Sequence, residues 1–279
     1  MTKNFFLTLD LKEWFHLEYL KPFVQKESFI FVNDLNDFLD KNNITITIFV
    51  LYDIAKKYPL IIKELRSKGH EIALHGYDHE LLYNLSPNKF EKQTIEAKDY
   101  LENLISEPII GYRAACFSMD EKKLSILNKI GFMYDSSYIK FSQHNLYNEF
   151  KIDDFKKISD FIYEKNNFYE FEIPTFKFFK FNIPISGGGY FRFFPYLMYK
   201  TIFVNHISFF NNYIFYVHPF ELNYKKFDLP NVPFKYKLRF NIGRKNNLNN
   251  LKSFILLLKN KGFKFSNIKE YIINLQKDE

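Results

Sequence analysis

Residues 5–10 of the chain read FFLTLD, a short apolar run that ends on a carboxylate. Large apolar side chains at nearly every position are typical of a strand that is buried on both faces. We therefore expect Phe5–Leu9 to form a buried β-strand that carries Asp10 at its carboxyl end. A buried carboxylate is costly unless it pairs with a cation or a metal ion, or acts as a base. The alternative is that Asp10 caps a helix beginning at Leu11.

Working outward from this strand, extended and helical patterns alternate along the first half of the chain. Short apolar or β-branched runs predict further strands at residues 44–50, 70–74, 109–112 and 132–134. Helical periodicity, with capping residues Ser86 and Asp120, predicts helices within residues 35–42, 54–68, 86–105 and 120–130. Strands that alternate with helices over short connections form a parallel sheet wrapped by helices. The sequence therefore predicts an α/β fold.

The pattern is less regular after Lys140. Residues 141–165 are polar and aromatic, and we expect them to form an insertion that shapes one wall of a cleft. Further strands are expected at residues 168–173 and 213–217, and helices at 195–205 and 248–261. Since neither an internal repeat nor a linker-like stretch interrupts the chain, we expect a single domain over residues 1–279.

Composition excludes several classes of protein. The 279 residues carry a net charge of +7, but lysines are spread along the chain and no nucleic-acid-binding motif occurs, so a nucleic acid polymer is not the expected partner. The single Cys116 excludes a disulfide framework and a cysteine-based zinc site. Neither a signal peptide nor an apolar stretch of about 20 residues is recognisable. We expect a cytoplasmic protein that can associate peripherally with the inner face of the membrane.

Polar residues with catalytic potential follow the predicted strands. Asp10, His75, Arg113, Asp135 and His218 all stand at or just past a predicted strand end. In parallel α/β folds the carboxyl ends of the strands meet at one edge, where active sites form. The spacing of HGYDH (residues 75–79) allows both histidines to face one metal ion. Each of these residues alone has a structural alternative, such as a core histidine or an ion pair, so their shared placement is the stronger signal.

Several local motifs together resemble the polysaccharide deacetylase family, the NodB-homology domain of carbohydrate esterase family four. LTLDLKEWFH (residues 7–16) is similar to the first motif in the branch that reads FDxEEWFH, and GYRAACFS (residues 111–118) resembles the third motif, usually FRAPSFS. The other matching stretches are TITIFVL (45–51), HGYDH (75–79), YDSS (134–137), GGGYFR (187–192) and VHPFE (217–221). The resemblance covers most of the chain and implies a distorted (β/α) barrel with fewer than eight complete repeats.

The resemblance also implies a divalent metal ion, usually Zn²⁺, that polarises an amide carbonyl and activates a water molecule. Carried over by motif, His75 and His79 are metal ligands and Asp10 is the general base. Arg113 orients Asp10 through a salt bridge, and His218 is the general acid that protonates the departing amine.

The remaining roles concern the oxyanion and the sugar. The resemblance assigns oxyanion binding to the backbone N–H of Cys116. Asp135 is expected to hold His218 or to line the sugar groove. Candidate side chains for stacking on sugar rings are Trp14, Tyr77, Phe117 and Tyr190.

One departure from the family pattern bears on the metal. The acidic ligand is expected two residues after Asp10, and that position is Lys12. An ammonium group cannot ligate a metal ion and repels it. Three outcomes are open at this point: Glu13 replaces the missing ligand, the histidines and water hold the ion weakly, or Lys12 fills the cavity and leaves a metal-free or inactive protein.

The expected activity is metal-dependent removal of an N-acetyl or N-formyl group from a sugar in cell-surface glycan synthesis. The substrate would be an N-acylated sugar linked to a nucleotide or to a lipid. The alternatives are a non-catalytic sugar-binding relative that has lost the metal site through Lys12, and an O-deacetylase.

Overall fold

A computed structural model describes residues 2–23, 33–141, 147, 150–224, 229 and 231–277. Its centre is one sheet, with the strand order β11-β1-β2-β3-β4-β5-β8-β7-β6 and with β12 beside β1. The parallel strands are β1 (Lys3–Leu11), β2 (Thr47–Val50), β3 (Glu71–Leu74), β4 (Gly111–Tyr112), β5 (Tyr134–Asp135), β8 (Phe168–Phe171), β11 (Asn212–Val217) and β12 (Phe263–Phe265). The sheet curls into an incomplete, distorted (β/α) barrel, as expected.

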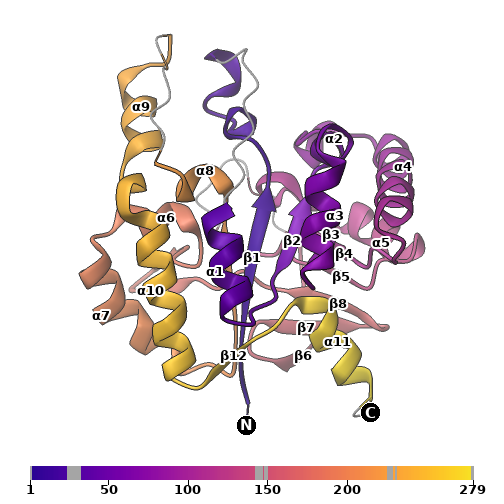
Figure 1. Ribbon diagram of the computed structural model, residues 1–279. Coiled ribbons are helices and arrows are strands. Elements are labelled where there is room, and N and C mark those ends of the chain that lie inside the picture. The colour runs from indigo at the N-terminus through magenta and orange to yellow at the C-terminus, as the bar shows by residue number, and fades with distance from the viewer. Residues whose placement is uncertain are drawn as a thin grey trace.

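Helices cover the outer face of the sheet, and Figure 1 shows α1 next to β1 with α10 on the other side of α1. The α-helices are α1 (Asn33–Lys41), α2 (Tyr52–Lys57), α3 (Pro59–Ser67), α4 (Pro87–Ile105), α5 (Glu121–Lys129), α6 (Gly188–Phe193), α7 (Tyr196–Ile207), α8 (Pro219–Leu222), α9 (Phe234–Asn241), α10 (Asn247–Asn260) and α11 (Ile268–Lys277). Short 3₁₀ turns are η1 (Trp14–His16), η2 (Lys21–Phe23), η3 (Leu82–Asn84), η4 (Ala115–Phe117) and η5 (Arg244–Asn246). No helix within the described ranges is long and apolar enough to cross a bilayer.

Strand β1 divides the interior into two layers. Because successive side chains of a strand point to opposite faces, Phe5 and Leu7 pack into the apolar core beneath the helices. Phe6 points into the barrel, where it shares a second apolar cluster with Ile268 and Ile272 of α11. Figure 1 shows α11 at the end of the sheet opposite α9. The barrel is therefore filled with apolar side chains at that end.

Several element boundaries differ from the sequence-based expectation. The predicted helix at residues 54–68 is two helices, α2 and α3, that meet at Tyr58. Pro59 begins α3, and a proline disfavours helical geometry in the residue before it, which explains the break. The predicted strand at residues 44–50 begins only at Thr47.

The expected insertion at residues 141–165 is in part an extension of the sheet. β6 (Lys156–Ser159) and β7 (Ile162–Lys165) form an antiparallel hairpin, and β7 pairs with β8. Tyr147 lines the cavity described below. Residues 142–146 and 148–149 lie outside the described part of the chain.

Two carboxyl groups face each other inside this sheet. Asp135 on β5 and Glu170 on β8 are register partners, and both are buried. Burial raises the pKa of Asp135 to about 7, and burial together with the Asp135 charge raises the pKa of Glu170 well above its usual value. The folded state therefore keeps protons that the unfolded chain releases above about pH 4. This contribution to stability is fully present below that pH and is lost as the pH rises through the raised values.

We expect the Glu170→Gln variant to gain stability relative to the natural chain as the pH rises from about 5 to about 7. The amide is neutral at every pH, so the free energy of unfolding of the variant should rise relative to that of the natural chain by on the order of 1 kcal/mol per pH unit. Urea unfolding of both proteins at each pH measures this difference in unfolding free energy. Both proteins contain the same buried histidines, so the contribution of these histidines cancels in the difference. Glu164→Gln, at a half-buried position on β7, is the matched control and should give a constant difference. A constant difference for Glu170→Gln as well would contradict a protonated pair.

Candidate active site

Arg113 is a fully buried cation that directly follows β4. Its guanidinium donates hydrogen bonds to Asp10 Oδ1 at 2.8 Å and to Thr8 Oγ1 at 2.7 Å. It also donates to the carbonyl oxygen of Ser136 at 3.0 Å and to the Ser136 hydroxyl at 2.8 Å. Its Cζ atom lies 4.1 Å from the ring centre of Phe49. The guanidinium thus ties β1 to the ends of β4 and β5, and the Asp10–Arg113 salt bridge that the resemblance predicts is present.

Asp10 is held in its ionised form. Burial alone would raise its pKa, but the charge of Arg113 and smaller contributions from His75, His218 and Lys12 outweigh burial and bring the pKa well below its usual value. The carboxylate also lines the cavity described below. It is therefore available to accept a proton at neutral pH.

His218 follows β11 and stands beside Asp10, with Nε2 3.7 Å from Asp10 Oδ2. Its other ring nitrogen, Nδ1, lies 3.1 Å from Glu221 Oε2, and the same oxygen accepts the backbone N–H of His218 at 3.0 Å. Arg192 Nε lies 3.6 Å from Glu221 Oε1. Burial acts to raise the pKa of Glu221, but the charges of His218 and Arg192 lower it. An ionised carboxylate therefore orients the imidazole.

Gly188 leaves room for that carboxylate. A Cβ atom at this position would lie 2.0 Å from Glu221 Oε2. Any side chain there would displace Glu221 from His218, so the GGGYFR stretch and the VHPFE stretch depend on each other.

The structure corrects the expectation for Asp135, which does not contact His218. It is the last residue of β5, and its carboxylate accepts the hydroxyl and the backbone N–H of Ser137 at 2.9 and 3.0 Å. The Ser137 hydroxyl in turn accepts the N–H of Ala114 at 2.8 Å. Through Ser137, Asp135 supports the loop that follows Arg113. The acid that holds His218 is Glu221.

His75 follows β3 and is buried. Its Nδ1 donates to the carbonyl oxygen of Arg113 at 2.9 Å. Its Nε2 is buried and has no hydrogen-bond partner in the described part of the chain. Burial lowers the pKa of His75 to about 3, with Lys12 adding to the effect against the opposing charge of Asp10. The ring is therefore neutral and keeps an unused lone pair, as a metal ligand would.

His79 is enclosed by the segment that follows β1. Lys12 Nζ lies 2.8 Å from Nε2 of His79, and Lys21 Nζ donates to the His79 carbonyl oxygen at 3.1 Å. His16 stacks on the ring with the centroids 5.9 Å apart, and Glu18 Oε1 lies 3.6 Å from Nδ1. Burial, followed by the charge of Lys12, lowers the pKa of His79 well below its usual value. A neutral imidazole therefore accepts the Lys12 ammonium at Nε2.

The ligand set that the resemblance implies for a divalent ion is incomplete. The unused lone pair of His75 fits a metal ion, but the lone pair of His79 Nε2 already accepts a hydrogen bond from Lys12. An ammonium group at that point repels a second cation. The residues therefore do not fit a metal ion at this position.

Of the three outcomes that the sequence leaves open, the structure does not support Glu13 as the replacement ligand. β1 ends at Leu11, the Lys12 N–H turns back to the Asp10 carbonyl oxygen at 2.9 Å, and Lys12 rather than Glu13 reaches His79. Glu13 is buried at the start of η1, and its N–H donates to His16 Nδ1 at 3.1 Å. Within the described residues, Glu13 does not join His75 and His79 in a group close enough to share an ion.

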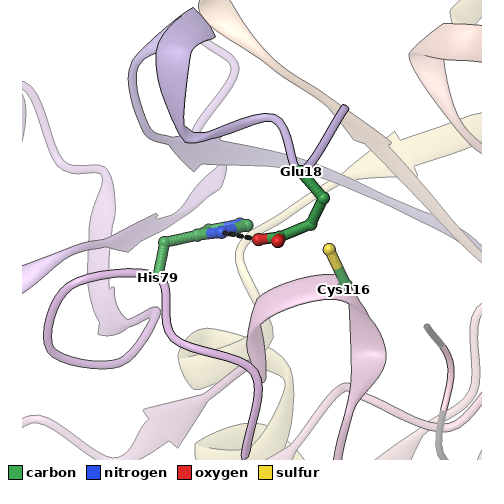
Figure 2. A group of neighbouring side chains, drawn as sticks. All are labelled: Glu18, His79 and Cys116. Carbon is green, nitrogen blue, oxygen red and sulfur yellow. Dashed lines mark ion pairs between the residues drawn. The ribbon is translucent and has the colours of Figure 1, made fainter. Parts of the chain in front are cut away.

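A different group of ligand types converges on the opposite side of the His79 ring. Figure 2 shows Glu18, His79 and Cys116 pointing toward one another, and their ligand atoms all lie within 4.8 Å. Lys21 forms an ion pair with Glu18, and burial raises the pKa of the Cys116 thiol. The group thus consists of a paired carboxylate, a neutral ring and a protonated thiol, which is a poor starting point for cation binding.

A cavity of about 490 Å³ opens beside these groups. Asp10, Lys12 and His218 line it, and so do Phe117 and Tyr190, two of the expected sugar-stacking residues. Cys116 lies at its wall in a left-handed backbone conformation, with φ of 48°. The cavity therefore brings the proton-transfer groups and two aromatic side chains together.

The other two expected stacking residues lie elsewhere, which corrects the prediction. Trp14 is buried in an apolar cluster and contacts the Phe240 ring at a centroid distance of 5.8 Å. Tyr77 packs against Tyr52 at 4.4 Å, and its hydroxyl donates to Glu96. Both rings fill space beside the site rather than line the cavity.

Sequence reasoning assigned no role to Glu221, Arg192 or Glu18. Glu221 and Arg192 stand inside the quoted VHPFE and GGGYFR stretches, so the signal was an acid three residues after His218 and a basic residue after the glycines. Glu18 had no comparable signal, because it reaches His79 only through the turns that follow β1.

Comparisons with known proteins identify related families. A family model described as polysaccharide deacetylase matches residues 30–134, a range that includes His75, His79 and Arg113 and begins after Asp10 and Lys12. A second model, described as a domain of unknown function (DUF3473), matches residues 136–273.

Two curated relatives match part of the chain. The chain is 33% identical over 92 residues to a peptidoglycan deacetylase-like protein of Gibberella zeae, which is 33% of this chain and 27% of that protein. It is 31% identical over 74 residues to a peptidoglycan-N-acetylglucosamine deacetylase of Bacillus cereus, which is 26% of this chain and 27% of that protein. The match therefore spans about a quarter of the length of these relatives.

The fold is also that of solved deacetylases. The Bc1960 peptidoglycan N-acetylglucosamine deacetylase superimposes with a TM-score of 0.56 at 16% identity, over 96% of this chain and 86% of that one. The matched family model, the motifs at the strand ends and the shared fold place this chain in the polysaccharide deacetylase family.

Proposed function

We propose that this protein hydrolyses the bond between an acyl group, acetyl or formyl, and the nitrogen of an amino sugar. The observation that carries the proposal is the pair formed by Asp10 and His218 at the cavity wall, 3.7 Å apart. A second charged residue holds each partner: Arg113 holds Asp10 and Glu221 holds His218. The curated relatives are described as peptidoglycan deacetylases, which supports a sugar amide as the substrate.

The proton transfers can be assigned to these groups. A water molecule attacks the acyl carbon, and the ionised Asp10 takes the proton that the water loses. The backbone N–H of Cys116 is proposed to stabilise the oxyanion that forms. His218 gives a proton to the sugar nitrogen as the carbon–nitrogen bond breaks, so that a carboxylic acid and an amine leave.

Phe117 and Tyr190 offer aromatic faces for the sugar ring. We propose that the substrate belongs to cell-surface glycan synthesis, as an N-acylated sugar on an anionic carrier. The basic composition supports an anionic carrier, since the net charge is +7.

A surface on the second half of the chain supports a lipid as that carrier. The hairpin of β9 (Phe176–Phe178) and β10 (Phe181–Ile183) packs on α7, with the Phe176 ring 5.3 Å from Phe203. Exposed apolar side chains on these elements and just after α7 are Phe178, Phe179, Phe181, Leu197, Ile202 and Phe209. Lys177, Lys180 and Lys200 stand among them, and no Asp or Glu occurs in residues 174–220. Exposed rings among positive charges are suited to the surface of an anionic bilayer.

We expect the protein to bind vesicles that contain anionic phospholipid and to bind vesicles of phosphatidylcholine weakly. Replacing Phe178 and Phe179 by serine should reduce binding roughly tenfold or more, because two exposed rings no longer enter the interface. Co-sedimentation at fixed salt measures the effect. Phe234→Ser, on α9, is a matched control with an equally exposed ring. Equal loss in the control, or no binding to anionic vesicles, would contradict the assignment.

We expect Asp10→Asn to reduce acetate or formate release from N-acylated glucosamine oligosaccharides by roughly 100-fold or more, because the proton acceptor is lost. Asp99→Asn, an exposed carboxylate on α4, should leave release unchanged. Circular dichroism and sugar binding check that the Asp10 variant is folded. Full activity of a folded Asp10→Asn protein would remove Asp10 from this role, and release from O-acetylated sugars alone would favour an esterase.

Glu221 acts through His218, so its variant needs a second readout. We expect Glu221→Gln to reduce turnover roughly tenfold. The pH above which turnover declines should also move to lower values, because a neutral amide stabilises an imidazolium less than a carboxylate does. A lower rate with an unchanged pH profile would indicate a structural role only.

A further inference from the structure

Lys12 places a buried ammonium group inside the site. The residue is 6% exposed, and its side chain lines the cavity together with Asp10. Nζ lies 2.8 Å from Nε2 of His79, and no carboxylate of the described residues is within ion-pair distance of it. We propose that this ammonium takes the place of the divalent ion that the family resemblance implies. The inference concerns the site of the proposed function and rests on that function only for its consequence for turnover.

Distance shows why the two cations exclude each other. A zinc ion binds a histidine nitrogen at about 2.0–2.1 Å along the lone pair. Lys12 Nζ lies 2.8 Å from the same nitrogen. An ion on this lone pair would therefore lie only about 0.7 Å from Nζ in a collinear arrangement, closer than any two atoms can approach. The lysine must leave before an ion can enter.

The hydrogen bond from Lys12 also determines which nitrogen of His79 carries the proton of the ring. Because Lys12 donates to Nε2, the single proton of the neutral ring is on Nδ1, the nitrogen that faces Glu18 at 3.6 Å. The lone pair of Nε2 then accepts the Lys12 hydrogen bond and Nδ1 carries the proton, so neither nitrogen offers a free lone pair to a metal ion. His79 is therefore not available as a ligand in the group of Glu18, His79 and Cys116 in Figure 2, nor in the expected pair of histidines.

His75 keeps its lone pair on Nε2, since its Nδ1 donates to the Arg113 carbonyl oxygen. One imidazole alone does not hold zinc, which needs at least three protein ligands in catalytic sites. Half of an ion site is therefore preserved, and the missing half is the acid that Lys12 replaces.

For turnover, the consequence is an ammonium group in the same cavity as Asp10. The ammonium can donate a hydrogen bond to the carbonyl oxygen of the substrate and stabilise the charge that develops there. This hydrogen bond transfers no proton, so the proton balance of the proposed reaction is unchanged. Chelators should then leave the turnover of the natural chain unaffected.

The length of the side chain suggests a restoring substitution. Nζ is the fifth side-chain atom of lysine, whereas the carboxylate oxygens of glutamate are in the fourth position. In Lys12→Glu, an ion bonded to the carboxylate would fall close to the present position of Nζ. The glutamine of Lys12→Gln has the shape of glutamate but carries no charge. This variant therefore removes the ammonium group and adds no anionic ligand.

The test is the zinc content of the natural chain and these variants. Each protein is purified without chelator, incubated with excess zinc chloride, desalted and analysed by mass spectrometry of the metal. We expect little zinc in the natural chain and in Lys12→Gln, and about one equivalent in Lys12→Glu. Adding His75→Ala to Lys12→Glu should remove that equivalent. Circular dichroism checks folding, and if Lys12→Glu does not fold, the zinc content of the natural chain decides.

About one equivalent of zinc in the natural chain would overturn the proposal. Cys116→Ser would then show whether the group in Figure 2 holds the ion. A folded Lys12→Glu protein without zinc would overturn it too. These results are separate from the proposed function: zinc binding restored in Lys12→Glu while the natural chain releases no acid would sustain the inference and refute the deacylase.

Discussion

The buried ion pair between Arg113 and Asp10 holds the active edge of the barrel together. The guanidinium bonds to β1 through Thr8 and Asp10 and to the end of β5 through Ser136. Removing one partner of such a pair leaves an uncompensated buried charge, which costs about 3–5 kcal/mol. The same contact that fixes the strand ends also keeps Asp10 ionised, so stability and chemistry depend on one arrangement.

Around this pair, other charged groups of the site also have partners of opposite charge. Glu221 pairs with His218 and Arg192, and Glu18 pairs with Lys21. Lys12 differs, because its described partner is a neutral imidazole rather than a carboxylate. The Lys12 ammonium group has no carboxylate partner among the described residues, so it gives the site a positive charge, as a bound metal ion would. This is why the position of Lys12, more than the histidines themselves, decides how the site works.

Much of this arrangement is readable from the sequence because it follows from strand geometry. An apolar run that ends on Asp10 predicts β1, and parallel strands bring their carboxyl ends to one edge, so Asp10, His75, Arg113 and His218 meet there. The motif resemblance adds the salt bridge between Asp10 and Arg113. Asp135 is the exception: it ends its strand as predicted but faces Glu170 within the sheet.

The side-chain positions that the sequence does not predict lie in segments that follow the ends of the strands. After Leu11 the chain turns back on itself, so no strand alternation predicts which of Lys12 and Glu13 reaches His79. Trp14 turns into an apolar cluster for the same reason. Tyr77 is held by Tyr52 and Glu96, contacts between segments far apart in the chain. Side-chain directions in such turns are set by tertiary packing, which local pattern does not encode.

The Lys12 ammonium group, we propose, takes the place of a metal ion at the buried imidazole of His79. A crystal grown in excess zinc, with diffraction recorded on both sides of the zinc absorption edge, tests it most directly. We expect no anomalous peak beside His75 and His79, and we expect Lys12 Nζ within hydrogen-bond distance of His79 Nε2. A strong peak within about 2.1 Å of both imidazoles, with Lys12 turned away, would contradict it.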